Sequence, residues 1–346
     1  MIKIQRSLVR GVRAATRATD LHRYLQSAVE LEHSTIPPYL TALFSLKPGT
    51  NDSIARMIRS IVVEEMLHLS IAANILVAIG GRPQINTPDF VPKYPGPLPM
   101  SIGGGGFEVG IEAFSKDLVE NTFMKIEEPE HPVPIRAVAA EEEEFATIGE
   151  FYAALKEKIT ELGDGIFSVG ADQQVLRWFS VDRLFPITNA QTAVRGIDVI
   201  VVEGEGTSTD PFQSPGDPAH FYKFGEILNG RRIVRTPDGF AYGGGPVPFD
   251  PAGVYPMKPN PGIADFEEGT QARTRVERYA YSYSSLLNAL HVAFNGRPDT
   301  IDTAIGLMYE LKVQAVALMQ TGIGGGRTAG PSYQYVNLQG GMRFAA

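Results

Sequence analysis

The chain has 346 residues, a formal net charge of −8 and 43% hydrophobic residues, an ordinary composition for a globular protein. The negative charge argues against general nucleic-acid binding, and no run approaches the roughly 18 consecutive apolar residues of a membrane span. There is no cysteine, which excludes disulfides, cysteine zinc sites, thiolate-ligated haem and iron–sulfur clusters. Any metal must therefore be held by histidine and carboxylate, and the cytoplasm is the expected compartment.

Six segments are predicted to be helices, and stretches rich in glycine and proline separate them. Their expected ranges are about 20–46, 51–79, 139–162, 188–203, 266–294 and 300–320. The first four predict a four-helix bundle, and the last two are extra C-terminal helices. Residues 207–265 are expected to form an insertion with a β-hairpin, because Pro237-Asp238-Gly239 lies between apolar runs. The whole chain, residues 1–346, is expected to be a single all-α domain.

Three polar residues fall on the apolar faces of the first two predicted helices. Glu32 continues the apolar face of the first helix, and Glu65 and His68 continue that of the second. A carboxylate buried alone is costly, whereas a shared metal ion keeps carboxylates ionised and imidazoles neutral. The three-residue spacing of Glu65 and His68 puts both on one side of the helix, as in carboxylate-rich two-metal bundles. The sequence therefore predicts a buried metal site.

Other acidic and histidine residues near this pattern have a different interpretation. Glu30 should face solvent, because it lies roughly 200° from Glu32 around the helix. Glu64 sits at the edge of the apolar stripe and is a candidate to contact a ligand rather than the metal. His33 is expected on the solvent side or behind the ligands. The histidines His131 and His291 are interpreted as structural.

The third and fourth helices leave alternatives open. Periodicity favours Glu144 over Glu150 as the inward carboxylate of the third helix. On the fourth helix, Glu203 follows Ile200 at helical spacing and is expected to point inward. No histidine follows Glu203 three residues later. His220, beyond a glycine break, is a candidate for that position, and a structural loop histidine is the alternative. No nucleophile or nucleotide-binding motif is present, so no catalytic residue is assigned.

Long blocks of the sequence also carry a family resemblance. They include residues 32–43, 64–69, 72–74, 147–152, 203–206, 220–224 and 307–312. These blocks resemble the ferritin-like domain family typified by the iminophenyl-pyruvate dimer synthase of violacein biosynthesis, over about residues 18–336. The resemblance implies a ferritin-like bundle with a metal-dependent oxidative role in specialised metabolism. It also implies a ligand set that takes Glu150 rather than Glu144: Glu32, Glu65, His68, Glu150, Glu203 and His220.

The leading functional hypothesis is therefore a non-haem oxidase or oxygenase with two metal ions, iron foremost and other divalent metals also compatible. Its expected partners are O₂ and a small substrate such as an amino-acid-derived imine. The alternatives are a non-catalytic bundle with a structural metal or buried polar network, and a ferroxidase or iron-storage subunit. The sequence names neither the substrate nor the oligomeric state, and a homodimer is compatible with it.

Overall fold

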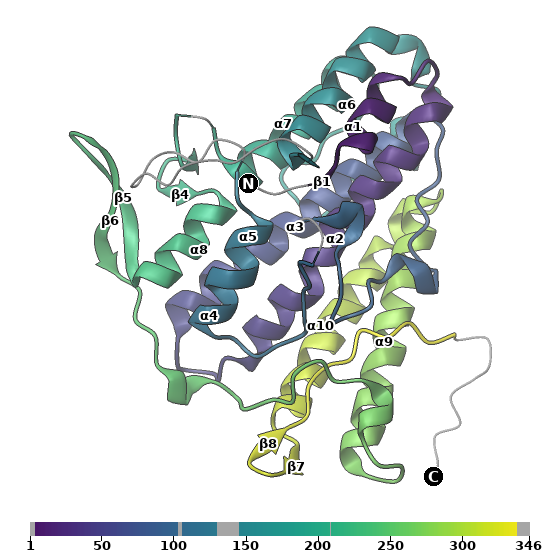
Figure 1. Cartoon of the computed structure of the whole chain (residues 1–346). Coiled ribbons are helices and arrows are strands. Elements are labelled where there is room, and N and C mark those ends of the chain that lie inside the picture. Colours follow the sequence, from purple (N-terminus) through teal and green to yellow (C-terminus); the bar gives the residue numbers. More distant parts are fainter. Residues whose placement is uncertain (1–3, 103–105, 130–144, 208, 338–346) are drawn as a thin grey trace.

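The structure is a computed structural model that describes residues 4–102, 106–129, 145–207 and 209–337. Two long helices, α2 (Ala18–Ser45) and α3 (Asp52–Ala78), run side by side through its middle. The pair α6 (Ile148–Leu162) and α7 (Ala190–Glu205) packs on them, with α1 (Arg6–Arg13) against α6. The pair α9 (Gln271–Phe294) and α10 (Ile301–Met319) lies at the other end (Figure 1). The predicted bundle with extra C-terminal helices is confirmed.

The helix α3 is the centre of the core. Its apolar residues are buried almost all round, including Ile54, Ile58 and Ile61 at 0% exposure, as expected for a helix surrounded by others. Within the described ranges, α3 is the one helix whose length and composition would suit a membrane span, and 89% of its most apolar window is buried inside the molecule. Polar side chains on α3 are therefore forced to find partners inside the protein.

The helix α2 continues through two consecutive prolines, Pro37 and Pro38. Proline has no N–H, so Pro38 cannot bond the carbonyl of Ser34 one turn earlier. The hydroxyl of Tyr94, from the long loop after α3, donates to that carbonyl at 2.6 Å. The loop thus supplies the hydrogen bond that the helix lacks, and it does so two residues after Glu32.

Two helices begin later than the sequence pattern predicts, and each start has a side-chain cap. The Thr147 hydroxyl accepts from the Glu150 N–H at 2.9 Å, and the Glu150 carboxylate accepts from the Thr147 N–H at 2.9 Å. This reciprocal box sets the start of α6 at Ile148, not near 139. Similarly, Thr270 caps α9, which begins at Gln271 rather than near 266. Residues 139–144 of the predicted third helix lie outside the described residues.

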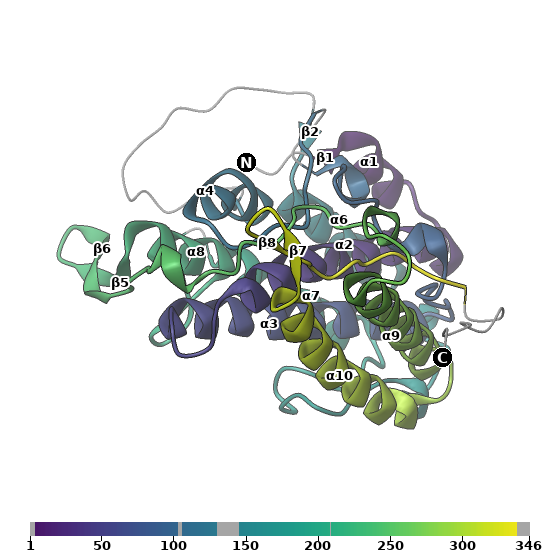
Figure 2. The same cartoon turned by 90° about the horizontal axis from the view of Figure 1, so that it is seen from below.

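The region predicted as an insertion contains a helix that belongs to the core. Between the short strands β3 (Phe212–Ser214) and β4 (Asp217–Pro218) and the hairpin lies α8 (His220–Asn229). Tyr222, Phe224 and Ile227 of α8 are fully buried. The predicted hairpin is present as β5 (Arg231–Thr236) and β6 (Gly239–Pro246), with Thr236 opposite Gly239. Seen from below, the hairpin projects from the side opposite α9 and α10 (Figure 2).

A second short segment brings a helix end into the core. Residues 116–126 form one helical run: α4 (Lys116–Leu118), a π-helical turn (Val119–Phe123) and α5 (Met124–Ile126). The remaining strands are two small antiparallel pairs, β1 (Ile4–Gln5) with β2 (Phe145–Ala146) and β7 (Gly322–Gly324) with β8 (Arg327–Thr328). Short 3-10 turns span Pro88–Phe90, Pro99–Ser101, Asp164–Ile166, Ala171–Gln173, Pro251–Gly253, Ile263–Asp265 and Pro298–Thr300.

Candidate metal centre

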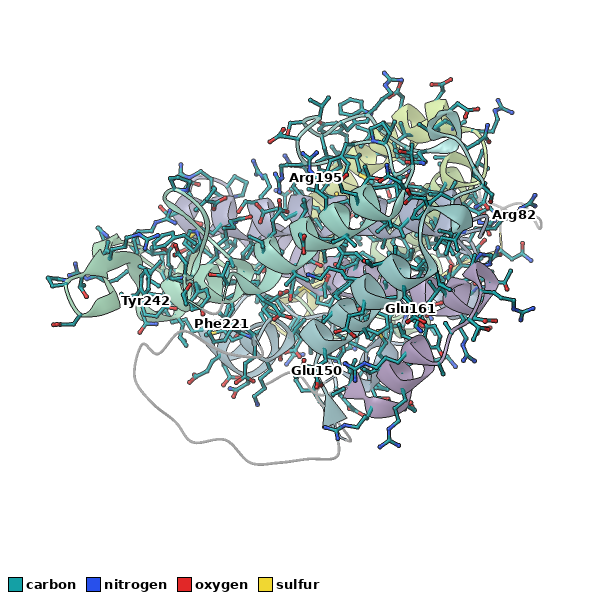
Figure 3. The ribbon with its side chains drawn as sticks, turned by 90° about the horizontal axis from the view of Figure 1, so that it is seen from above. Arg82, Glu150, Glu161, Arg195, Phe221 and Tyr242 are labelled. Atoms are coloured by element: carbon teal, nitrogen blue, oxygen red, sulfur yellow. The ribbon has the colours of Figure 1, made fainter. Side chains whose placement is uncertain are left out.

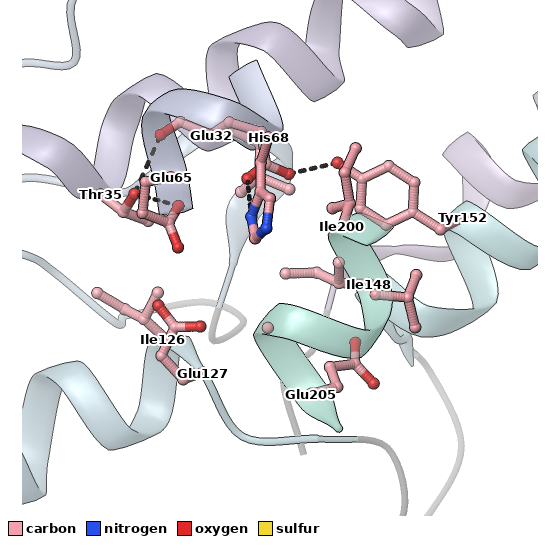
Figure 4. A pocket seen from close by; sticks show the side chains of 13 residues that line it. Glu32, Thr35, Glu65, His68, Ile126, Glu127, Ile148, Tyr152, Ile200 and Glu205 are labelled. Carbon is pink, nitrogen blue, oxygen red and sulfur yellow. Dashed lines mark hydrogen bonds and ion pairs between the residues drawn. The ribbon is translucent and has the colours of Figure 1, made fainter. Parts of the chain in front are cut away.

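Five buried side chains from four elements meet inside the molecule. Glu32 comes from α2, Glu65 and His68 from α3, Glu127 follows α5, and His220 is the first residue of α8. Figure 4 shows the Glu32, Glu65 and Glu127 carboxylates and the His68 ring around one gap. Their donor atoms form two groups, each within 4.8 Å: Glu32, Glu65 and His68, and Glu65, Glu127 and His220. Glu65 belongs to both groups, so two positions share one carboxylate.

In the first group, the His68 ring lies between two carboxylates. Its Nδ1 is 3.4 Å from Glu32 Oε2, on the side of the shared Glu65. Its Nε2 is 3.0 Å from Glu203 Oε2, on the outer side. Arg183 in turn donates from Nε to Glu203 Oε1 at 2.8 Å. Glu203, expected as a metal ligand, is buried, but its carboxylate contacts His68 Nε2 and belongs to neither group of candidate ligands.

The second group repeats this arrangement around His220. Its Nδ1 lies 2.9 Å from Glu65 Oε1 and 3.4 Å from Glu127 Oε2. Its Nε2 lies 3.0 Å from Glu64 Oε2 on the outer side. The buried ammonium of Lys223 donates to that Glu64 oxygen at 2.8 Å. In each imidazole, Nδ1 therefore faces the centre, and Nε2 contacts a carboxylate that is itself paired with a cationic side chain.

Three hydroxyl groups orient the inner carboxylates. Tyr152 donates to Glu32 Oε1, and Tyr39 donates to Glu127 Oε1 at 2.5 Å. The hydroxyl of Thr35 donates to Glu65 Oε2 at 2.8 Å. Each carboxylate thus uses one oxygen for a fixed hydroxyl and keeps its other oxygen for the centre. Those other oxygens, Glu32 Oε2, Glu65 Oε1 and Glu127 Oε2, are the ones nearest the two Nδ1 atoms.

The electrostatics of the cluster favour positive charge. Burial raises the pKa of Glu65 to about 7, and the neighbouring Glu127 and Glu32 charges act in the same direction. Burial opposes protonation of the histidines, but hydrogen bonds with Glu203 and Glu32 raise the pKa of His68 to about 10. The carboxylates of Glu127, Glu64 and Glu65 around its ring likewise raise the pKa of His220 well above its usual value. Three inner carboxylates thus stabilise cations at this centre.

The donor set fits two divalent metal ions. Carboxylate oxygen and imidazole nitrogen suit iron, manganese or zinc, and the three glutamates contribute −3 against +4 for two such ions. The His220 Nδ1 atom is fully buried and makes no well-oriented hydrogen bond among the described residues, although two carboxylates lie close. Ligands on opposite sides of one ion lie about 4.2 Å apart, so donors within 4.8 Å need only a small contraction.

The structure separates Glu150 from this centre. Its carboxylate caps α6 through the Thr147 N–H, and its side chain is only partly buried. Figure 3 shows Glu150 at the beginning of α6, on the outside of the helical layer. The capping role explains the position, because the third residue of a helix is where a carboxylate reaches back to the preceding N–H. The alternative, Glu144, lies outside the described residues, as does His131.

Glu127 is the ligand candidate that sequence reasoning missed. It is 8% exposed and follows Val119 and Phe123, both fully buried, at spacings of eight and four residues. That is the same helical signal that singled out Glu65. The signal was obscured because residues 116–126 form only a short helix with a π turn, and because the prolines that begin at Pro129 are typical of a linker.

Two cavities lie along the α6–α7 face of the centre. The inner one has a volume of about 50 Å³ and is lined by Glu32, Glu65, His68, Glu127, Tyr152 and several aliphatic residues. It holds a few waters or a diatomic gas, but no aromatic metabolite. The outer one, about 330 Å³, is lined by Gly149, Ala153 and Lys156 of α6 and by residues of α7. Val201 and Glu205 line both cavities, so the two adjoin.

Known proteins are similar to this chain in sequence and in fold. A family model described as ferritin-like matches residues 25–229. The chain is 24% identical to dichlorochromopyrrolate synthase from Lentzea aerocolonigenes; the match covers 94% of this chain but only 36% of that protein. The crystal structure of a ferritin-like protein from Caulobacter vibrioides is 25% identical and superposes with a TM-score of 0.61. That superposition covers 90% of this chain and 97% of the other.

Proposed function

Because this chain belongs to the ferritin-like family, we propose that it is a two-metal oxidase or oxygenase. Iron is the proposed metal, at the two positions that share Glu65. One observation carries the proposal: Glu65 takes part in both buried three-residue groups, and each group adds one glutamate and one histidine. Iron bound there would supply the redox chemistry with O₂, which no side chain of this chain supplies by itself.

The protein's own residues would prepare the centre for that role. Tyr152 and Tyr39 hold Glu32 and Glu127, so each terminal carboxylate keeps one orientation. The aliphatic residues Ile126, Ile148 and Ile200 line the inner cavity and limit water near the metals (Figure 4). The small inner volume would admit O₂ beside the ligands, while the larger outer cavity would take the organic substrate.

The proposed substrate is a small metabolite, such as an amino-acid-derived imine. The similarity to dichlorochromopyrrolate synthase supports an enzyme of specialised metabolism. An outer cavity of about 330 Å³ is at the lower end of the volumes that bind small organic ligands. This chain spans about a third of that relative's length, so the oxidative step itself is proposed and the relative's full reaction is not.

The test is metal content, followed by oxygen consumption. Purified wild-type protein, reconstituted anaerobically with Fe(II), should contain about two irons per chain by elemental analysis. Glu65→Ala should contain none, because Glu65 serves both positions. The loaded wild type should then consume O₂ faster when candidate imines are added. Absence of bound iron after reconstitution would reject the oxidase, and tightly bound zinc without O₂ consumption would favour a structural metal.

A further inference from the structure

We propose that Arg183 is a positioning residue shared by both metal positions. Its guanidinium holds Glu203 by hydrogen bonds and lies within ion-pair distance of Glu64. These two carboxylates orient the imidazoles of His68 and His220. The inference rests on the proposed metal centre. It concerns a residue far from the ligands in sequence, on a loop between α6 and α7.

The contacts of the guanidinium carry the proposal. Arg183 Nε donates to Glu203 Oε1 at 2.8 Å, and Nη2 lies 2.6 Å from Glu203 Oε2, which is a two-pronged contact. The same Nη2 lies 3.7 Å from Glu64 Oε1. One nitrogen therefore stands between the carboxylate behind His68 and the carboxylate behind His220. A planar guanidinium can hold two acceptors in fixed directions, which an ammonium cannot.

The loop between α6 and α7 places the positively charged guanidinium of Arg183 at the protein surface. The Arg183 N–H bonds the Ser180 carbonyl at 3.0 Å, and the following residues Leu184 and Phe185 are buried and anchor the turn. The Arg183 side chain is 33% exposed, whereas the Glu203 and Glu64 side chains are 10% and 6% exposed. Arg183 thus neutralises buried carboxylates from a position that still touches solvent.

The consequence for the ligands follows from imidazole chemistry. An imidazole that donates its Nε2–H to a fixed carboxylate is held in one tautomer and one ring orientation, with Nδ1 available for a metal. The cation partner of Glu203 in this arrangement is Arg183, whereas Glu64 also binds Lys223 and Gln213. Loss of Arg183 should therefore disturb the His68 position strongly and the His220 position more weakly.

Cobalt(II) is the probe that separates the two positions. In the Co(II)-loaded protein, each coordinated imidazole should give one solvent-exchangeable, strongly shifted Nε2–H proton resonance. Glu203→Gln should move only the resonance of His68, and Lys223→Gln only that of His220. Arg183→Gln should move or broaden both. We expect Co(II) affinity to fall about 10- to 100-fold at the His68 position and a few-fold at the other.

Controls distinguish positioning from folding. Arg273→Gln is the matched control, because Arg273 is also a partly exposed arginine that binds a carboxylate, but its partner is Glu277 on α9, away from Glu203 and Glu64. It should leave both resonances unchanged. If Arg183→Gln does not fold by circular dichroism, Arg183→Lys keeps the charge, and its single ammonium should still shift the His68 resonance.

The outcomes separate the two proposals. Two Co(II) ions per chain, with both resonances altered in the Arg183 variant, would support the inference. Two ions with wild-type resonances and affinities in Arg183→Gln, or in Arg183→Lys where that variant is needed, would overturn the inference and leave the metal centre standing. Fewer than two ions in the wild type would overturn both.

Discussion

Adjacent residues of α2, Glu32 and His33, are both buried but in opposite kinds of environment. Glu32 faces the centre, where its carboxylate lies with those of Glu65 and Glu127 beside two histidines. His33 faces away, onto Phe90 and Tyr283, and its Nε2 shares a hydrogen bond with the Tyr283 hydroxyl at 2.7 Å. Burial lowers the pKa of His33 to about 3, so this histidine stays neutral.

The comparison shows that burial alone does not indicate a ligand. On the His33 face a neutral ring is accommodated by aromatic packing and one hydrogen bond, although its Nδ1 has no partner among the described residues. On the Glu32 face the like charges of Glu32, Glu65 and Glu127 require cations. The two faces should therefore respond differently to metal, to mutation and to pH.

The largest difference should appear in metal-linked stability. Divalent metal at about 100 times its dissociation constant should raise the free energy of unfolding by about 2.7 kcal/mol for each ion bound, because it binds only the folded centre. Chelation should reverse the gain. Glu65→Ala should abolish it, whereas His33→Phe should retain it. Denaturant titrations with and without metal measure both, and an equal gain in Glu65→Ala would contradict the shared-ligand assignment.

Removing one terminal carboxylate should remove one ion. Glu32→Gln should lose the ion on the His68 side, and Glu127→Gln the ion on the His220 side, leaving about one metal per chain by elemental analysis. Glu150→Gln is the matched control: it keeps the length of the side chain that caps α6 and should retain both ions. Loss of metal in Glu150→Gln alone would instead restore Glu150 to the ligand set.

On the other face, Tyr283→Phe should destabilise the protein without changing metal content. The variant leaves His33 Nε2 buried without its hydrogen bond, at a cost of about 1–3 kcal/mol in the free energy of unfolding. Urea titration at neutral pH measures the cost. A drop in bound metal would mean that the two faces of α2 are coupled.

The pH dependence contributed by His33 should be similar in size, about 2 kcal/mol between pH 6.5 and 5. Its pKa is about 3 in the folded protein and 6.5 ordinarily, so the unfolded chain binds the proton first as pH falls. The stability that His33 contributes is therefore complete above pH 6.5. It is lost by about 1.4 kcal/mol per pH unit between pH 6.5 and 3. The difference between wild type and His33→Phe, measured by urea titration from pH 7 to 5, isolates this slope; a flat difference would contradict it.

The sequence by itself determined the helical bundle and three of the five residues of the centre. Glu32, Glu65 and His68 lie at helical spacing on apolar faces, and helical periodicity is a local property that survives into the fold. The sequence also predicted the hairpin at 231–246, because a Pro-Asp-Gly sequence between apolar runs favours a tight turn.

Tertiary structure decided the rest, because the remaining roles depend on which elements meet. Glu127 reaches the centre because the short helix α5 ends there. His220 reaches it because the helix α8 begins there. Helical spacing made Glu203 a candidate ligand, and the family resemblance made Glu150 one. In the structure, Glu203 lies behind His68 and Glu150 caps its own helix. The role of a carboxylate depends on which group it contacts. Packing of distant segments decides that contact, and sequence spacing does not.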